Sequence, residues 1–237
     1  MADKSRVLVI YTGGTIGMVH EPESGLYKPF DFKYLLNHVP ELKYMDVNLD
    51  TIAYKKPIDS SDMTPEKWIE LAATIYDNYN KYDGFVILHG SDTMSYTASA
   101  LSFMLEGLNK PVIITGSQLP IGVVRTDGKE NLITSIEIAA DKRNGIPIVS
   151  EVAIYFEYQL LRGNRTYKRN AEYFNAFRSD NYPRLAEAGI RIDYNYAALK
   201  KANKQELKLN KELDSNIAIL KLFPGITQNV VSAILNA

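Results

Sequence analysis

Four short runs of apolar residues recur along the chain, separated by longer segments in which apolar residues have helical spacing. Such continuous apolar runs are typical of strands that are buried on both faces of a parallel sheet. The runs cover residues 7–10, 85–88, 112–114 and 152–156, and a further strand is expected near residues 47–53. Strands that alternate with helices predict an α/β fold, in which helices flank a parallel sheet.

Three segments carry helix signals. Thr64 and Pro65 supply an N-cap and a first-turn proline ahead of an apolar stripe. Residues 94–108 predict a second helix. Residues 127–141 predict a third, because apolar residues recur there every three or four positions.

The composition changes near residue 194, where lysine, asparagine and glutamate become frequent and predict an exposed linker. Residues 217–222 then predict a strand and residues 228–235 a helix. One βα unit cannot enclose a core, so we expect it to pack on the first domain, on another copy or on a continuation of the chain. The expected limits are 1–193 for the N-terminal domain, 194–215 for the linker and 216–237 for the start of a smaller domain.

Composition narrows the chemistry that is available. The 237 residues are 46% hydrophobic and 23% charged, with a formal net charge of -1, which gives no electrostatic case for binding nucleic acid. The chain has no cysteine and three histidines, so we expect neither a thiolate nucleophile nor a zinc site. No apolar stretch approaches the roughly 20 residues of a membrane span, and no signal segment precedes the first strand. These features predict a cytoplasmic protein without a membrane segment.

Two loops place hydroxyl residues beside glycines directly after predicted strands. Thr15 follows Gly14, and Ser91 and Asp92 follow Gly90. Because ligands of open α/β sheets bind beyond the carboxyl ends of strands, both loops are expected to face one pocket. Two plainer interpretations stay open. The first loop suits a phosphate-binding turn, although it lacks G-x-G-x-x-G and a Walker lysine, and the second suits the N-cap of the following helix.

Three further segments carry polar side chains whose role the pattern alone leaves undecided. Ser60 and Ser61 lie in a turn ahead of the first predicted helix, where a capping loop is the plainer interpretation. Lys168 follows a buried strand, and a buried lysine is suited to proton transfer, whereas a solvated one is the commoner case. Tyr27 is one of 16 tyrosines, most of which are structural.

In their order along the chain, these segments resemble the asparaginase family of bacterial type, most closely its cytoplasmic type I branch. The motifs that carry the resemblance are TGGTIG, GLYKP, DSSDM, HGSDTM, TGSQLP and RGNRTYK. The resemblance implies a flavodoxin-like N-terminal domain, a linker and a smaller C-terminal α/β domain. It implies hydrolysis of L-asparagine to L-aspartate and ammonia with no cofactor or metal, by a homodimer or homotetramer.

Carried over position by position, the resemblance makes Thr15 the nucleophile that forms an acyl-enzyme, assisted by Tyr27 on a lid. Ser91 and Lys168 then move protons or activate water, and Asp92 holds the ammonium group of the substrate. Most relatives have threonine where this chain has Ser91, and the hydroxyl is retained. The implied substrate-binding residues are Gly14, Ser60, Ser61, Gly90, Ser91 and Asp92, with Ser60 and Ser61 on the α-carboxylate.

Three other functions stay open. The same core occurs in an amidase subunit of a tRNA-dependent amidotransferase, and a non-catalytic module can use such a pocket to sense asparagine. The fold by itself also suits a flavin- or nucleotide-binding protein. Because the family continues beyond residue 237, we expect the isolated chain to be weakly active at most. L-Glutamine differs from L-asparagine by one methylene, so weak activity on L-glutamine is compatible with the prediction.

Overall fold

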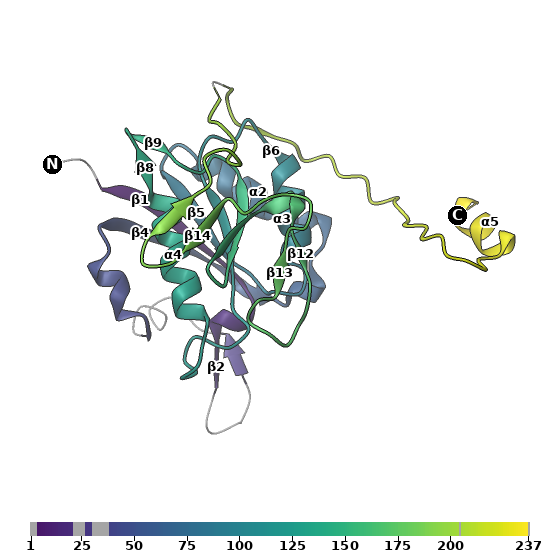
Figure 1. Ribbon diagram of the computed structural model, residues 1–237, viewed down its shortest axis with the longest axis horizontal. Helices are drawn as coiled ribbons and strands as arrows, with labels where there is room; N and C mark the ends of the chain where they lie inside the picture. The colour runs from purple at the N-terminus through teal and green to yellow at the C-terminus, as the bar shows by residue number, and fades with distance from the viewer. Residues whose placement is uncertain (1–3, 21–26, 30–37, 204, 237) are drawn as a thin grey trace.

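The computed structural model describes residues 4–20, 27–29, 38–203 and 205–236, and only the backbone at residues 19, 20 and 27–29. Among the described residues, an eight-stranded sheet forms the centre of the molecule, in the order β15-β14-β11-β10-β7-β5-β1-β4 (Figure 1). Its strands are β1 (Ser5–Gly13), β4 (Val47–Ile58), β5 (Gly84–Leu88), β7 (Val112–Thr115), β10 (Val152–Phe156), β11 (Gln159–Arg162), β14 (Ala186–Ala188) and β15 (Ile192–Tyr194).

Five neighbouring strands of this sheet are parallel. They lie in the order β4-β1-β5-β7-β10, which in chain order is 2-1-3-4-5. That order is the flavodoxin-like one, and its crossover direction reverses between β1 and β5. The predicted α/β fold with a flavodoxin-like sheet is therefore confirmed, and ligands are expected at the carboxyl ends of β1 and β5.

Both faces of the sheet are covered, and for this reason its parallel strands are apolar at successive positions. In β1, Val7 and Val9 contribute to the core on one face, whereas Leu8 and Ile10 contribute to the core on the other. Helix α4 (Gly128–Ala140) packs on the first face. Helices α2 (Pro65–Asn78) and α3 (Met94–Met104) pack on the second. Each fully buried aliphatic side chain stabilises the fold by roughly 1.5–3 kcal/mol.

The predicted helices are present, with one corrected end. Thr64 is the N-cap of α2, and Asp127 and Asp141 bound α4, as the sequence predicts. Helix α3 ends at Met104 rather than at residue 108. The chain leaves the helix there because β6 (Leu105–Glu106) pairs with β16 (Lys208–Leu209).

The antiparallel side of the sheet begins with a tight hairpin. Strand β10 turns into β11 through Glu157 and Tyr158, whose φ angles are 45° and 63°. Positive φ at both central residues is typical of a type I′ turn. Past β11 and a 3-10 turn at Gly163–Arg165, β12 (Tyr167–Lys168) pairs with β13 (Phe177–Arg178). Two smaller ladders join β2 (Met18–His20) to β3 (Tyr27–Pro29) and β8 (Lys142–Arg143) to β9 (Ile146–Pro147).

The segment predicted as an exposed linker is anchored at several points. Ala198 and Leu199 are buried in the core, and β16 pairs with β6. The prediction of an exposed linker is therefore wrong at these positions, because the apolar side chains of Ala198 and Leu199 pack in the core although two lysines follow them in the sequence. The domain limits at residues 193 and 215 remain predictions.

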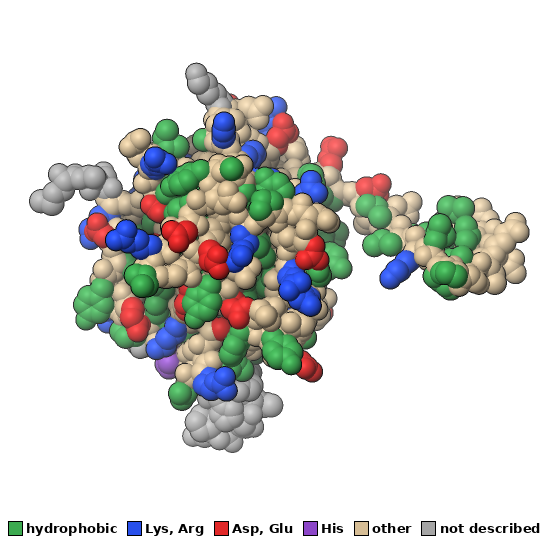
Figure 2. Space-filling model, viewed as in Figure 1, with side chains coloured by type: hydrophobic (Ala, Val, Ile, Leu, Met, Phe, Trp, Pro, Cys, Tyr) green, Lys and Arg blue, Asp and Glu red, His purple; other side chains and the backbone are tan. Residues whose placement is uncertain are grey.

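The last described residues extend away from the body of the molecule (Figures 1 and 2). Residues 217–222 form no strand in the described chain, contrary to the prediction, because a strand requires a neighbouring strand to accept its hydrogen bonds. Helix α5 (Gln228–Leu235) forms as predicted. Several apolar side chains of this segment are exposed, among them Ile217, Ile219, Leu222 and Phe223. None of the described helices is both long and apolar enough to cross a membrane.

Candidate active site

The two glycine-rich loops meet at the carboxyl ends of β1 and β5. Gly14 has a φ of 90°, and a Cβ atom on it would lie 2.4 Å from the backbone nitrogen of Gly90. A Cβ atom on Gly90 would in turn lie 2.6 Å from the Oγ of Ser60. An added side chain would clash at both positions, because the neighbouring segments lie so close. The TGGTIG, HGSDTM and DSSDM motifs are therefore in direct contact. The structure confirms that the two loops face one region.

Thr15 begins a 3-10 turn, Thr15–Gly17, directly after this contact. Thr15 is partly exposed, and the neighbouring Thr12 donates from Oγ1 to the carbonyl of Leu88 at 2.9 Å. This bond ties the end of β1 to the end of β5. The backbone of Tyr27 lies in β3, and its side chain lies outside the described part of the structure. The role of the Tyr27 hydroxyl is therefore left as a sequence prediction.

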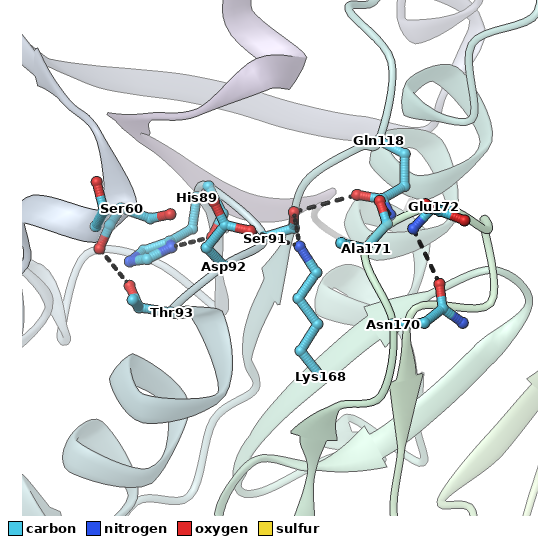
Figure 3. A network of polar contacts seen from close by, with 12 residues as sticks. Ser60, His89, Ser91, Asp92, Thr93, Gln118, Lys168, Asn170, Ala171 and Glu172 are labelled. Atoms are coloured by element: carbon cyan, nitrogen blue, oxygen red, sulfur yellow. Dashed lines mark hydrogen bonds and ion pairs between the residues drawn. The ribbon is translucent and has the colours of Figure 1, made fainter.

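Ser60 and Ser61 lie in a 3-10 turn, Ser60–Asp62, and the two serines differ in their exposure to solvent. Ser60 is buried, and its carbonyl accepts a bond from Thr93 Oγ1 at 2.5 Å (Figure 3). Ser61 is exposed, and its amide and hydroxyl both donate to Asp59 Oδ1. These two bonds lower the pKa of Asp59 below its usual range. The capping interpretation thus holds for Asp59, and Ser60 is the serine that contacts the Gly90 loop.

Lys168 reaches across from β12 to the loop that follows β5 (Figure 3). Its Nζ donates to Ser91 Oγ at 2.9 Å and to Asp92 Oδ1 at 2.7 Å. The Lys168 side chain is 13% exposed, so the commoner case of a solvated lysine does not apply. Asp92 is 66% exposed, which leaves its carboxylate open to solvent and to ligands. A hydroxyl, an ammonium and a carboxylate therefore form one cluster, as the motifs predict.

The simple N-cap interpretation of Ser91 and Asp92 is wrong. The N-cap of α3 is Thr93, and its hydroxyl bonds to Ser60 instead of to the helix. Ser91 and Asp92 both bond to Lys168. Neither side chain is used to cap the helix, so both are available for chemistry at the carboxyl end of the sheet.

His89 is the buried anchor of this loop. Its Nδ1 lies 2.7 Å from the carbonyl of Gly90, and its Nε2 lies 2.9 Å from Thr97 Oγ1, which itself accepts a bond from Trp68 Nε1. Because the Gly90 carbonyl can only accept, Nδ1 carries the proton and Nε2 accepts from Thr97. Burial lowers the pKa of His89 to about 4. A neutral histidine thus holds the backbone of Gly90 in place.

Two residues of the site were not singled out from the sequence. Gln118 Oε1 accepts a bond from Ser91 Oγ at 3.2 Å. Asp127 accepts bonds from the backbone amides of Gln118 and Leu119 at 3.0 and 3.1 Å. Burial raises the pKa of Asp127, although these amides oppose the shift. Gln118 belongs to the TGSQLP motif after β7, and its position after a third parallel strand is the signal that could have indicated it.

A cavity of about 630 Å³ opens beside this cluster. Asp92, Tyr96, Tyr167 and Lys168 are among its lining residues. An anionic group and a cationic group thus line the cavity together with two phenols, which suits a small ligand that carries charge. The described residues contain no group of His, Asp and Glu side chains that could hold a metal ion.

The sheet order places the protein in the class of flavodoxin-like α/β proteins, which bind ligands at the carboxyl ends of the strands, where the hydroxyl–lysine–carboxylate cluster lies. Within that class, the chain belongs to the asparaginase family, because residues 6–200 match the family described as "Asparaginase, N-terminal".

Individual relatives agree with this assignment. L-asparaginase 1 of Escherichia coli strain K12 is 44% identical over 229 residues, which cover 96% of this chain and 66% of the relative. A 60 kDa lysophospholipase of Mus musculus is 40% identical, over 99% of this chain and 45% of its own length. The crystal structure of L-asparaginase I from Vibrio cholerae superposes with a TM-score of 0.87 at 42% identity, over 98% of this chain and 69% of that one. The chain thus spans slightly under two thirds of the E. coli relative and less than half of the mouse one.

Proposed function

We propose that the protein hydrolyses L-asparagine to L-aspartate and ammonia, with Thr15 as the nucleophile. The observation that carries the proposal is the bonding of Lys168 to both Ser91 and Asp92 in a nearly buried position, beside the contact of the Gly14 and Gly90 loops. The likeness to L-asparaginases of E. coli and V. cholerae supports the choice of substrate.

The reaction proceeds in two steps that share one acyl-enzyme. In the first, Thr15 Oγ1 forms a bond to the side-chain amide carbon, the C–N bond breaks, and the threonine proton leaves with the nitrogen as ammonia. In the second, water attacks the ester carbon, the bond to Thr15 Oγ1 breaks, and the threonine regains its proton. Tyr27 assists the first proton transfer, and Ser91 with Lys168 assists the second.

The substrate carries two charges that the site is suited to bind. The exposed carboxylate of Asp92 holds the α-ammonium group, and Ser60 and Ser61 with Gly14 bind the α-carboxylate. Backbone amides beside Gly90 and Ser91 stabilise the oxyanion, a contribution that is about 3 kcal/mol in comparable sites. The His89 anchor supports this role, because it fixes the backbone that would supply the donors.

Ammonia release from L-asparagine and L-glutamine tests the proposal. The assay compares this chain, the complete protein encoded by its gene, and the Thr15→Val variant of each, with Thr74→Val on the outer helix α2 as a matched control. We expect release from L-asparagine, weaker release from L-glutamine, and loss of both on Thr15→Val but not on Thr74→Val. Calorimetric binding of L-asparagine without turnover would instead establish the sensing function. Release that requires a charged tRNA would establish the amidotransferase function.

A homodimer or homotetramer in the cytoplasm belongs to the same proposal. Exposed apolar side chains at Ile217, Ile219 and Phe223 support it, because association with another copy would remove them from water. Sedimentation equilibrium of the complete protein tests the oligomeric state, and a monomer at micromolar concentration would contradict it.

A further inference from the structure

Gln118 connects the Ser91–Lys168 pair to the loop that follows the lysine (Figure 3). Its side-chain oxygen accepts from Ser91 Oγ at 3.2 Å. Its side-chain nitrogen donates to the carbonyls of Ala171 and Tyr173, both at 3.1 Å. The amide therefore uses its donors and its acceptor at once, between two segments that are distant from it in the sequence.

The two carbonyl partners determine which way the amide of Gln118 faces. A carbonyl oxygen accepts hydrogen bonds and cannot donate them, so the NH₂ group must face Ala171 and Tyr173. A flipped amide would place its oxygen against two carbonyl oxygens. The Oε1 atom must consequently face Ser91, and it requires a donor there.

This requirement fixes the proton of the Ser91 hydroxyl. A hydroxyl has one proton and two lone pairs. The proton points to Gln118 Oε1, so a lone pair accepts from the ammonium group of Lys168 at 2.9 Å. The hydrogen bonds then run in one direction, from Lys168 through Ser91 to Gln118, and the second lone pair of Ser91 remains for a ligand or a water molecule.

Both ends of this connection are held rigidly. The backbone of Gln118 is bound by the half-buried carboxylate of Asp127, which also accepts from Asn131 Nδ2 at 3.2 Å. On the other side, Asn170 Oδ1 accepts from the amides of Glu172 and Tyr173 at 3.2 and 2.9 Å. The Gln118 amide is therefore preorganised rather than free to turn toward solvent.

We propose that Gln118 is a positioning residue that orients the Ser91 hydroxyl, so that Ser91 accepts from Lys168 and keeps one lone pair for a ligand or a water molecule. This role rests on the function proposed above, in which Ser91 and Lys168 move protons. Without an acceptor at residue 118, the hydroxyl proton can turn toward the position of that ligand, and the direction of the hydrogen bonds is lost.

The experiment locates the deuteron of the Ser91 hydroxyl by neutron diffraction from perdeuterated crystals. Gln118→Leu and Gln118→Met both remove the acceptor, so either suffices if the other fails to fold. Gln118→Glu retains an acceptor. Asn170→Ala is the matched control, because it loosens the same loop without contacting Ser91. The kcat and KM of ammonia release are measured on the same proteins.

We expect the deuteron to lie between Ser91 Oγ and Gln118 Oε1 in the wild type and in Asn170→Ala, and to point elsewhere in Gln118→Leu and Gln118→Met. The kcat of these two variants should fall by roughly threefold to tenfold with little change in KM, which corresponds to one net hydrogen bond. Gln118→Glu should retain most of the wild-type kcat. A Ser91 deuteron that points away from Gln118 in the wild type, or an equal fall of kcat in Asn170→Ala, would overturn the proposal.

The two proposals fail in different ways. The diffraction experiment needs no turnover, so a Ser91 deuteron that faces Gln118 in a protein that releases no ammonia would contradict the asparaginase function and retain the positioning role. Ammonia release by a protein whose Ser91 deuteron points away from Gln118 would support the asparaginase function and contradict the positioning role.

Discussion

Gly14 and Gly90 are in backbone contact: a Cβ atom on Gly14 would lie 2.4 Å from the nitrogen and 2.6 Å from the Cα of Gly90. This contact joins the loop that carries Thr15 to the loop that carries Ser91 and Asp92. Because both loops leave neighbouring parallel strands, the close approach sets the spacing between the proposed nucleophile and the proton-transfer cluster. Glycine is required at both positions for space, and at Gly14 also for its positive φ.

Gly14→Ala should therefore separate the loops. The positive φ alone costs about 1 kcal/mol, and the backbone clash adds to it because neither partner is a flexible side chain. We expect a loss of at least about 2 kcal/mol in the free energy of unfolding, measured by urea denaturation, together with a loss of most activity. Gly145→Ala is the control, because Gly145 has a φ of 78° and no atom within 4 Å of the added Cβ. Equal losses in the two variants would show that the contact with Gly90 is unimportant.

Acid should destabilise the protein through His89. Burial lowers its folded-state pKa to about 4, against about 6.5 when unfolded, so the unfolded chain binds the proton more readily. The stability that neutral His89 provides is thus present above pH 6.5 and falls by about 3 kcal/mol as the pH drops toward 4. Urea unfolding of wild type and His89→Gln at several pH values isolates this loss from that of the carboxylates. Parallel stability curves for the two proteins would contradict the assignment.

Thr97 bridges helix α2 and the Gly90 loop, since its hydroxyl accepts from Trp68 Nε1 and donates to His89 Nε2. Thr97→Val retains the shape but leaves both nitrogens without this partner, at a cost of about 2 kcal/mol or more. Thr97→Ser retains the hydroxyl and should cost about 1 kcal/mol for the lost methyl group. Guanidinium denaturation measures both, and a Val variant as stable as the Ser variant would show that these bonds are weak.

Arg162 and Glu151 form a nearly buried ion pair at the start of the segment that leads to Lys168. The Arg162 guanidinium bonds to Glu151 Oε2 at 2.5 Å and lies over the ring of Tyr182. Arg162→Met should destabilise the fold by about 3 kcal/mol, because it leaves the carboxylate of Glu151 buried without its cation.

Adding Glu151→Gln to Arg162→Met should restore part of that stability, because the buried charge is then removed as well. Thermal unfolding of the single and double variants measures the coupling. Strictly additive losses would show that the two side chains do not act as a pair.

The parallel core could be predicted from the sequence because its strands are buried on both faces. The runs containing Val7 and Phe85 are apolar at every position, and a strand covered on both sides is the structure that such a run favours. The hairpin from β10 to β11 could not be predicted in the same way. Its turn is Glu157-Tyr158, both at positive φ, where Asn-Gly or Asp-Gly is the usual signal. Tertiary packing imposes a conformation there that local preference does not indicate.

In the candidate site, too, some residues could be predicted from the local sequence, whereas others depend on tertiary contacts. Hydroxyls and a carboxylate beside glycines at strand ends indicated Thr15, Ser91 and Asp92, because strand ends of a parallel sheet converge, whereas Lys168 was indicated by the resemblance to the asparaginase family. Gln118 was missed because an amide in a loop has no chemistry of its own, and its role depends on partners from two distant segments. The strand expected at residues 217–222 failed for a related reason: an apolar run specifies a strand only where a neighbouring strand is present.

The identity of the nucleophile is the central claim and can be tested by trapping the acyl-enzyme. The complete protein is mixed with L-asparagine, quenched in acid within milliseconds, and digested for mass-spectrometric peptide mapping, with Thr15→Val as the control. We predict an aspartyl ester on the peptide that contains Thr15, absent from the variant. An ester on Ser91, or ammonia release by Thr15→Val at the wild-type rate, would contradict it.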